Sequence, residues 1–169
     1  MDDLGIEYQT VLGFPPVDFV HLAADLGCRY ISMKARGGGG PYNPFDHPPF
    51  SFLDDLSLRR RMIAAMSQRG VSISLGEGFV VQPGTDLLDD RASLDLMSEF
   101  GVTRANAVTM DPDLNRSFDQ FAAFRESART RPGLGFGARV RHADGYSIAL
   151  GCAQWWHRVR ISLTMPRVG

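Results

Sequence analysis

Apolar and polar positions follow two alternating periods along the chain. Apolar residues within 16–26 recur at i, i+3, i+4 and i+7, which predicts an amphipathic helix, and they are Phe19, Leu22, Ala23 and Leu26. In residues 71–75 apolar positions alternate with serines, which is typical of a strand. Further strands are expected at 4–12, 30–33 and 102–110. Helices are expected over 57–69 and 87–100, and after residue 113.

Glycines mark where the predicted helices end. Gly27, Gly70 and Gly101 each stand between a helical stretch and a strand, where glycine takes the left-handed conformation without a steric penalty. A chain that alternates helix and strand in this way builds an α/β fold with a parallel sheet and right-handed crossovers. The candidates are a (β/α)8 barrel and an open doubly wound sheet. No glycine-rich first turn follows the first strand, which disfavours a nucleotide-binding open sheet.

Composition indicates a globular protein. The 169 residues are 44% hydrophobic and 22% charged, which suits one ordinary domain. No apolar run reaches the ~18 residues of a membrane span, and the N-terminus lacks the features of a signal peptide. We therefore expect a cytoplasmic protein without a membrane partner.

Charge divides the chain in two. Residues 1–124 carry 10 Lys or Arg against 17 Asp or Glu, whereas residues 125–169 carry 8 Arg against 2 acids. We treat 1–124 as one unit and 125–169 as a basic, atypical tail. The tail is either a frameshifted or aberrant end, or a genuine divergent segment with a strand near 134–140. The basic run 59–61 fits a solvated helix face better than nucleic-acid contact, so no nucleic-acid partner is expected.

Several segments within 4–124 carry a family resemblance. They are residues 15–27, the helix and strand over 59–77, the stretch 79–86, and Asp111-Pro112-Asp113 with the helix that follows. Together they resemble the N-terminal half of the sugar phosphate isomerase/epimerase family, the xylose isomerase-like TIM barrels. The resemblance implies a partial (β/α)8 TIM barrel, with about four βα units followed by the tail. A full barrel needs roughly 250 residues.

The resemblance also implies a chemistry. The family isomerises or epimerises small sugars or polyols with a divalent metal (Mn, Mg, Zn or Co), held by Glu, Asp, His and Glu from the second half of the barrel. Residues 134–142, where the first of these ligands is expected, contain no carboxylate, so no metal ligand is identifiable in this chain. The alternative is a catalytically inactive half-barrel that self-associates through open sheet edges or pairs with another chain.

Glu77 is the main candidate for a catalytic residue. It is expected to close its strand, the place where barrel enzymes carry binding groups, with Gly76 and Gly78 leaving room for a ligand. The alternative is a strand-end acid that pairs with a neighbouring Lys or Arg. His47, in the long Gly- and Pro-rich loop over 36–50, is the second catalytic candidate, because histidine titrates near neutral pH. A turn residue among prolines is the alternative.

Three further residues are candidates for substrate binding. Glu7 and Gln9 are expected within the first strand, where a buried Glu needs a partner or a pocket. Asp111 follows the strand over 102–110 and is placed to bind sugar hydroxyls. An Asp-Pro pair also begins turns and caps helices, which is the structural alternative for Asp111.

Overall fold

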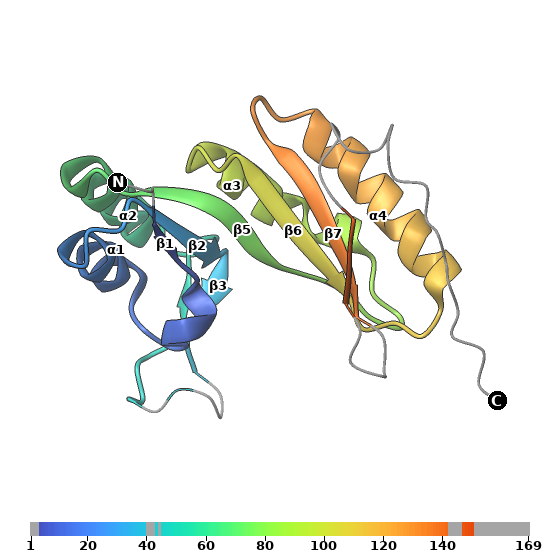
Figure 1. Cartoon of the computed structure of the whole chain (residues 1–169), viewed down its shortest axis with the longest axis horizontal. Helices are drawn as coiled ribbons and strands as arrows, with labels where there is room; N and C mark the ends of the chain where they lie inside the picture. The colour runs from blue at the N-terminus through green and yellow to red at the C-terminus, as the bar shows by residue number, and fades with distance from the viewer. Residues whose placement is uncertain (1–3, 40–42, 44, 142–146, 151–169) are drawn as a thin grey trace.

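A curved sheet of six strands runs through the chain (Figure 1). The computed structural model describes residues 4–39, 43, 45–141 and 147–150. Strand order is β1-β2-β5-β6-β7-β8, and every neighbouring pair is parallel except β7 and β8. The strands are β1 (Gly5–Ile6), β2 (Tyr30–Lys34), β5 (Ser72–Val81), β6 (Arg104–Thr109), β7 (Gly135–Arg141) and β8 (Ser147–Leu150). A separate antiparallel pair joins β3 (Arg36–Gly37) to β4 (Phe50–Ser51). The expected α/β class is confirmed.

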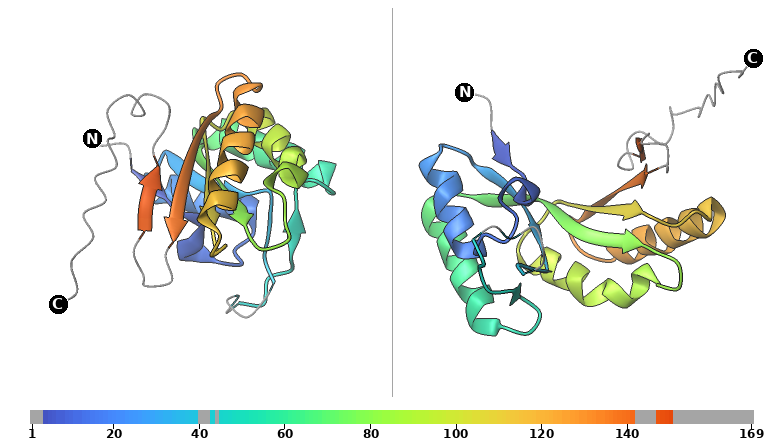
Figure 2. Two further views of the ribbon diagram at one scale, coloured as in Figure 1. Left: turned by 90° about the vertical axis from the view of Figure 1, so that its right-hand side faces the viewer. Right: turned by 90° about the horizontal axis from the view of Figure 1, so that it is seen from below.

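Helices lie along one face of this sheet (Figure 2). They are α1 (Pro16–Asp25), α2 (Leu56–Arg69), α3 (Arg91–Glu99) and α4 (Leu114–Arg129). Phe124 of α4 packs on Phe79 of β5 and Phe136 of β7, with ring centroids 4.8 and 5.3 Å apart. Aromatic pairs at these separations add to the stabilisation from apolar burial. The hydrophobic core therefore lies between the sheet and its helices.

No α-helix in the described part of the chain covers the other face of the sheet (Figure 2). Side chains that alternate with the core-facing positions of β5 and β6 are only half-buried, and they are Leu75, Val80, Asn106 and Val108. Their neighbours on the helix-covered face, such as Ala105 and Ala107, are fully buried. We call the less covered side the inner face, because a closed barrel encloses this side of its sheet.

Local signals for helix ends agree with the structure. Pro16 begins α1, where proline has no hydrogen bond to lose. Gly70 ends α2 in the left-handed conformation, with φ 65°. The α4 helix begins after Asp113, whose side chain accepts a hydrogen bond from the Arg116 amide. Capping of this kind satisfies an amide that the helix itself leaves unpaired.

The first strand is shorter than its apolar pattern predicts. β1 covers only Gly5–Ile6, and residues Tyr8–Val11 form a 3-10 helix. The Tyr8 amide donates to the Ser32 hydroxyl at 2.8 Å, and the Tyr8 ring packs edge-on against Phe19. The tyrosine is thus buried where the chain leaves the path of β1 and forms the 3-10 helix against β2. Glu7 and Gln9 are consequently not strand residues, which corrects the expectation for both.

The βα alternation continues beyond the expected boundary at residue 124. That position lies inside α4, and β7 then pairs in parallel with β6 from Arg104↔Gly135 to Thr109↔Val140. A strand near 134–140 was expected only if the tail is genuine. Residues 151–169 lie outside the described residues, so the division at 124 and the origin of the tail stay predictions. No described helix is both long and apolar enough to cross a membrane.

Candidate functional site

Glu77 lies where β2 ends beside the longer strand β5. Lys34↔Glu77 is the last pair between β5 and β2, and β5 then continues to Val81 beside β6. Glu77 is therefore inside its strand and does not close it, contrary to the sequence expectation. The pairing of β5 with β6 is irregular between Gly76 and Phe79. Irregularities of this kind re-aim side chains and are frequent next to active sites.

Gln9 is brought next to Glu77 by the short 3-10 helix after β1. Its Nε2 donates to Glu77 Oε2 at 3.2 Å, across 68 residues of sequence. Glu77 is 7% exposed, whereas Gln9 is exposed. A buried carboxylate is stable only where donors replace lost water. Gln9 supplies one such donor, so two of the five predicted site residues meet in the structure.

The two glycines beside Glu77 have different surroundings: Gly76 is packed against α3, whereas Gly78 lines the cavity described below. A Cβ on Gly76 would lie 2.8 Å from Met97 Sδ, so this glycine allows α3 to pack closely on the sheet. Gly78 has φ +100°, a conformation that other residues rarely adopt. Both glycines therefore shape the backbone that positions Glu77.

A cavity of about 260 Å³ opens beside Glu77, where β2 ends and β5 runs on. Its walls come from the ends of β2 and β5 and from the start of α3, and its polar lining residues are Lys34, Arg36, Glu77, Asp90 and Ser93. The volume lies just below the roughly 300–1,000 Å³ range of drug-sized ligand pockets, so it suits a small molecule. This is the carboxyl end of the parallel strands β2 and β5, where α/β folds bind ligands.

Lys34 is a lining residue that the sequence patterns did not single out. It ends β2 and shares the register position of Glu77 on the neighbouring strand. Its aliphatic carbons lie over Gly78, where a Cβ would meet Lys34 Cγ at 3.5 Å. The end of a strand followed by a long loop was the available signal for this residue, but a cation there is also typical of a solvated strand end.

The other predicted residues are placed away from the Glu77–Gln9 contact. Glu7 is exposed, and its carbonyl accepts from the Thr10 hydroxyl at 2.7 Å. His47 lies in the long loop, with its ring edge-on to Phe14 at 5.6 Å. Neither has a contact with Glu77 within the described residues. Their expected roles in substrate binding and catalysis stay predictions.

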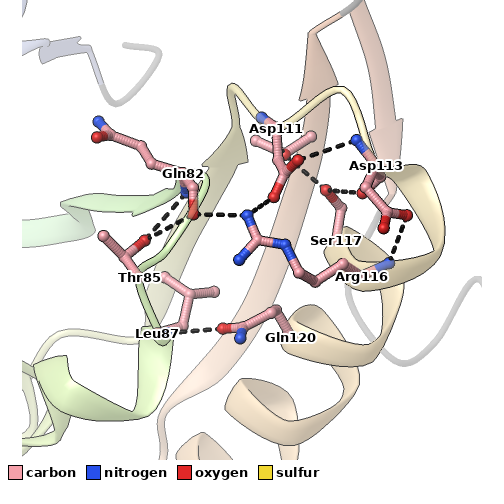
Figure 3. A network of polar contacts seen from close by, with 9 residues as sticks. Gln82, Thr85, Leu87, Asp111, Asp113, Arg116, Ser117 and Gln120 are labelled. Atoms are coloured by element: carbon pink, nitrogen blue, oxygen red, sulfur yellow. Dashed lines mark hydrogen bonds and ion pairs between the residues drawn. The ribbon is translucent and has the colours of Figure 1, made fainter.

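Asp111 is held in a network at the start of α4 (Figure 3). Its Oδ1 accepts from the Asp113 amide at 2.9 Å, and its Oδ2 forms an ion pair with Arg116. Arg116 also donates to the Gln82 carbonyl at 2.8 Å, which ties the turn after β5 to α4. Because both oxygens of this buried carboxylate have partners, the geometry favours the turn-forming alternative over sugar binding.

The described residues do not fit the divalent metal that the resemblance implies. Among them, no three His, Cys, Asp or Glu side chains lie close enough together to hold a metal ion. Glu77 accepts from the Gln9 side-chain amide, and Asp111 is paired with the Arg116 guanidinium. Metal sites for sugars need several oxygen or nitrogen ligands at once. We therefore assign no metal-dependent step to this part of the chain.

Comparison with known proteins identifies the fold. No protein-family model matches the sequence, and no curated protein is similar to it in sequence. Among solved structures, the chain is similar to the IolI protein with a bound zinc atom, at 15% identity and a TM-score of 0.60, over 85% of this chain and 54% of that one. It is also similar to a xylose isomerase-like TIM barrel protein from Mycobacterium smegmatis in complex with magnesium, at 14% identity and a TM-score of 0.57, over 79% and 53%.

A third similar structure is a sugar phosphate isomerase/epimerase from Parabacteroides distasonis, at 14% identity and a TM-score of 0.53, over 82% of this chain and 51% of that one. The chain thus spans about half the length of the solved structures that it matches. Likeness at this identity concerns the fold alone. The chain has the fold of a partial TIM barrel.

Proposed function

We propose that this chain binds a small sugar or polyol in the cavity beside Glu77, as part of a barrel of the sugar isomerase/epimerase type. The observation that carries the proposal is the buried Glu77 carboxylate, oriented by Gln9 and lining a small cavity at the carboxyl ends of the strands. Sugar hydroxyls are suitable donors for such a carboxylate, which has acceptor positions beyond the one that Gln9 uses. The fold of the neighbours supports this choice of ligand class.

The proposed reaction is isomerisation or epimerisation, and it needs more than the described residues. Glu77 is placed to accept a hydroxyl proton of the sugar, and Gln9 holds the carboxylate in position for this. The metal ligands that the family resemblance implies have no counterpart in the described part of the chain. Turnover is therefore proposed only for an assembly that supplies the rest of the barrel.

Calorimetric titration tests the binding proposal. The protein is titrated with pentoses, hexoses and their polyols at millimolar concentration, as wild type, Glu77→Gln and Asp119→Asn. Asp119 is an exposed carboxylate on α4 and serves as the matched control. We expect Glu77→Gln to weaken binding roughly tenfold, the loss of one hydrogen bond to a charged group, and Asp119→Asn to bind as wild type. Equal affinity in all three proteins would contradict the proposal.

A second candidate function follows from the uncovered inner face: a half-barrel that associates with a second chain. Leu75, Val80 and Val108 are half-buried there, although they lie on the central strands of the sheet. In a closed barrel such side chains are packed in layers. The edge of β7, however, is already paired with the antiparallel β8. Association through the inner face is therefore favoured over simple extension of the sheet at that edge.

A further inference from the structure

A second cavity lies at the opposite end of β2 from Glu77. Its volume is about 570 Å³, and it is bordered by the ends of α1 and α2 and by the first residues of β2 and β5. This volume lies within the roughly 300–1,000 Å³ range of small-molecule sites. A Cβ added to Gly27 or Gly70, which both line the cavity, would meet no atom within 4 Å. The space at the two helix ends is therefore open to a ligand.

Backbone amides of the chain itself cap the two helices that end at this cavity. The Cys28 amide donates to the Ala23 carbonyl at 2.8 Å after α1, and the Val71 amide donates to the Met66 carbonyl at 3.1 Å after α2. Bonds of this kind satisfy carbonyls that the end of a helix leaves unpaired. Capping of these helices therefore does not require the arginines that line the cavity.

Arg29 and Arg69 bring guanidinium groups to this cavity from different elements. Arg69 is the last residue of α2, and its Nη2 forms an ion pair with the Asp25 carboxylate of α1. Arg29 precedes β2, and its backbone bonds to the Leu4 carbonyl at 3.1 Å and to the Ser72 amide at 2.9 Å. A guanidinium has five N–H donors, so one contact within the protein leaves others for a ligand. None of the described residues that line the cavity is acidic.

We propose that this cavity is a second ligand site, which binds a small organic molecule with two oxyanion groups, carboxylate or phosphate. The planar fork of a guanidinium matches the oxygens of either group. Two forks from different walls suit two such groups on one molecule, and the volume admits the carbon chain between them. The site is separate from the cavity beside Glu77, so it does not depend on the function proposed there.

Calorimetric titration at constant ionic strength tests the ligand class. The probes are succinate with two carboxylates, phosphoglycolate with a phosphate and a carboxylate, butyrate with one carboxylate, and neutral 1,4-butanediol. We expect succinate or phosphoglycolate to bind with a millimolar or lower Kd, and the tighter of the two identifies the preferred anion. Butyrate should bind roughly tenfold more weakly, since one charge-assisted contact is missing. Absence of binding by both dianions at tens of millimolar, or equal binding of butyrate, would overturn the proposal.

Arginine variants test whether the two guanidiniums form the site. We expect Arg29→Gln and Arg69→Gln each to weaken binding of the dianion roughly tenfold. Arg60→Gln removes an exposed cation of α2 that does not line the cavity and is the matched control. It should change the affinity less than about twofold, because exposed charges away from a ligand act weakly. Equal losses in all three variants would show attraction by net charge alone and would overturn the proposal.

A variant pair at Ala24 gives a check that leaves the Arg69–Asp25 ion pair in place. Ala24 lies in α1 and lines the cavity. Ala24→Glu adds a carboxylate there, and Ala24→Gln adds a neutral side chain of the same size. We expect Ala24→Glu to bind the dianion roughly tenfold more weakly than Ala24→Gln, because like charges repel. Equal affinity in the two variants would place the anion elsewhere.

The thiol of Cys28 reports whether the cavity itself is occupied. Cys28 is half-buried and lines the cavity, and Cys152→Ser makes it the single thiol, since the sequence has two cysteines. We expect the dianion, at concentrations that saturate binding, to slow alkylation of Cys28 by neutral iodoacetamide several-fold. Glu77→Gln should leave this protection unchanged, which separates the second site from the proposed sugar site. Unprotected Cys28 at saturation, or protection that disappears in Glu77→Gln, would overturn the proposal.

Discussion

Three buried polar residues in the described part of the chain, Glu77, Asp111 and Tyr8, have specific partners. Glu77 accepts from Gln9, and Asp111 is held by Arg116 and the Asp113 amide. Tyr8, which is 1% exposed, donates its hydroxyl to the Phe14 carbonyl at 3.1 Å. Such groups are costly to bury without partners, so substitution of either partner has a measurable effect.

Tyr8 is expected to make the protein sensitive to alkaline pH. Burial raises the pKa of its phenol above the ordinary value of 10.0, and a backbone hydrogen bond from Gly13 lowers it by less. A raised pKa in the folded state means that the unfolded chain loses this proton first. The contribution to stability is therefore complete below about pH 10 and is lost as pH rises through the folded pKa.

Tyr8→Phe removes that titration. At neutral pH we expect the free energy of unfolding of the variant to be about 1 kcal/mol lower than that of wild type, because the hydrogen bond to Phe14 is missing. As pH rises above about 10, the free energy of unfolding should fall less in the variant than in wild type. Urea unfolding at several pH values from neutral to alkaline measures both effects. If the free energy of unfolding falls equally with pH in wild type and in Tyr8→Phe, burial does not raise the pKa of Tyr8.

Arg116 is expected to matter more for stability than an exposed arginine. The Asp111 side chain is 3% exposed, so Arg116→Met leaves a buried carboxylate without its cation. We expect a loss of about 2–3 kcal/mol in the free energy of unfolding. Arg129→Met is the control, since its pair with Glu126 is exposed on both sides and contributes at most about 0.5 kcal/mol. Similar losses in the two variants, measured by urea unfolding, would show that the network in Figure 3 is not stabilising.

At the scale of elements, β5 determines where the cavity forms. One edge of β5 pairs with β2 from Ser72 to Glu77, and the other edge pairs with β6 from Gly76 to Val81, with a register shift between Gly76 and Phe79. Beyond Lys34 the strand β2 is no longer beside β5, which exposes the carboxyl end of β2 and the side of β5 together. The cavity at Glu77 follows from the end of β2 beside the longer β5.

Gly78→Ala tests whether that irregularity positions the site. The position has φ +100°, and holding alanine there costs about 1–3 kcal/mol. Gly84→Ala, at φ +80° in a turn with open space around it, imposes a comparable strain away from the cavity. We expect both variants to lower the melting temperature, and only Gly78→Ala to weaken sugar binding in calorimetric titration. If Gly78→Ala binds sugar with unchanged affinity, the irregular pairing of β5 does not position the binding site.

At the scale of the whole molecule, a sheet with helices on only one of its faces predicts self-association through the inner face. Val108→Arg places a charge on the inner face, where it opposes burial against another chain. Leu26→Arg changes a residue that is 62% exposed, beyond the end of α1, and is the control. In sedimentation velocity across a concentration range, we expect wild type and Leu26→Arg to associate and Val108→Arg to remain monomeric. A wild-type protein that stays monomeric throughout would argue against the half-barrel assembly.

Most of the fold could be predicted from local signals. The helix-ending glycines and the two apolar periods indicate a parallel α/β sheet, because each is a property of neighbouring residues. The site was predictable only in part. Gln9 approaches Glu77 because the chain turns at Tyr8 to bury its ring, and Lys34 belongs to the cavity because β2 ends there beside the longer β5. Both facts depend on contacts between distant segments, which alternation along the sequence does not encode.

The most direct test of the account is a crystal structure of the protein with the sugar or polyol that binds tightest in the titration. The account predicts the ligand in the cavity at the ends of β2 and β5, with a hydroxyl within hydrogen-bond distance of the Glu77 carboxylate. A ligand bound elsewhere, or an empty cavity at concentrations far above the measured Kd, would contradict it.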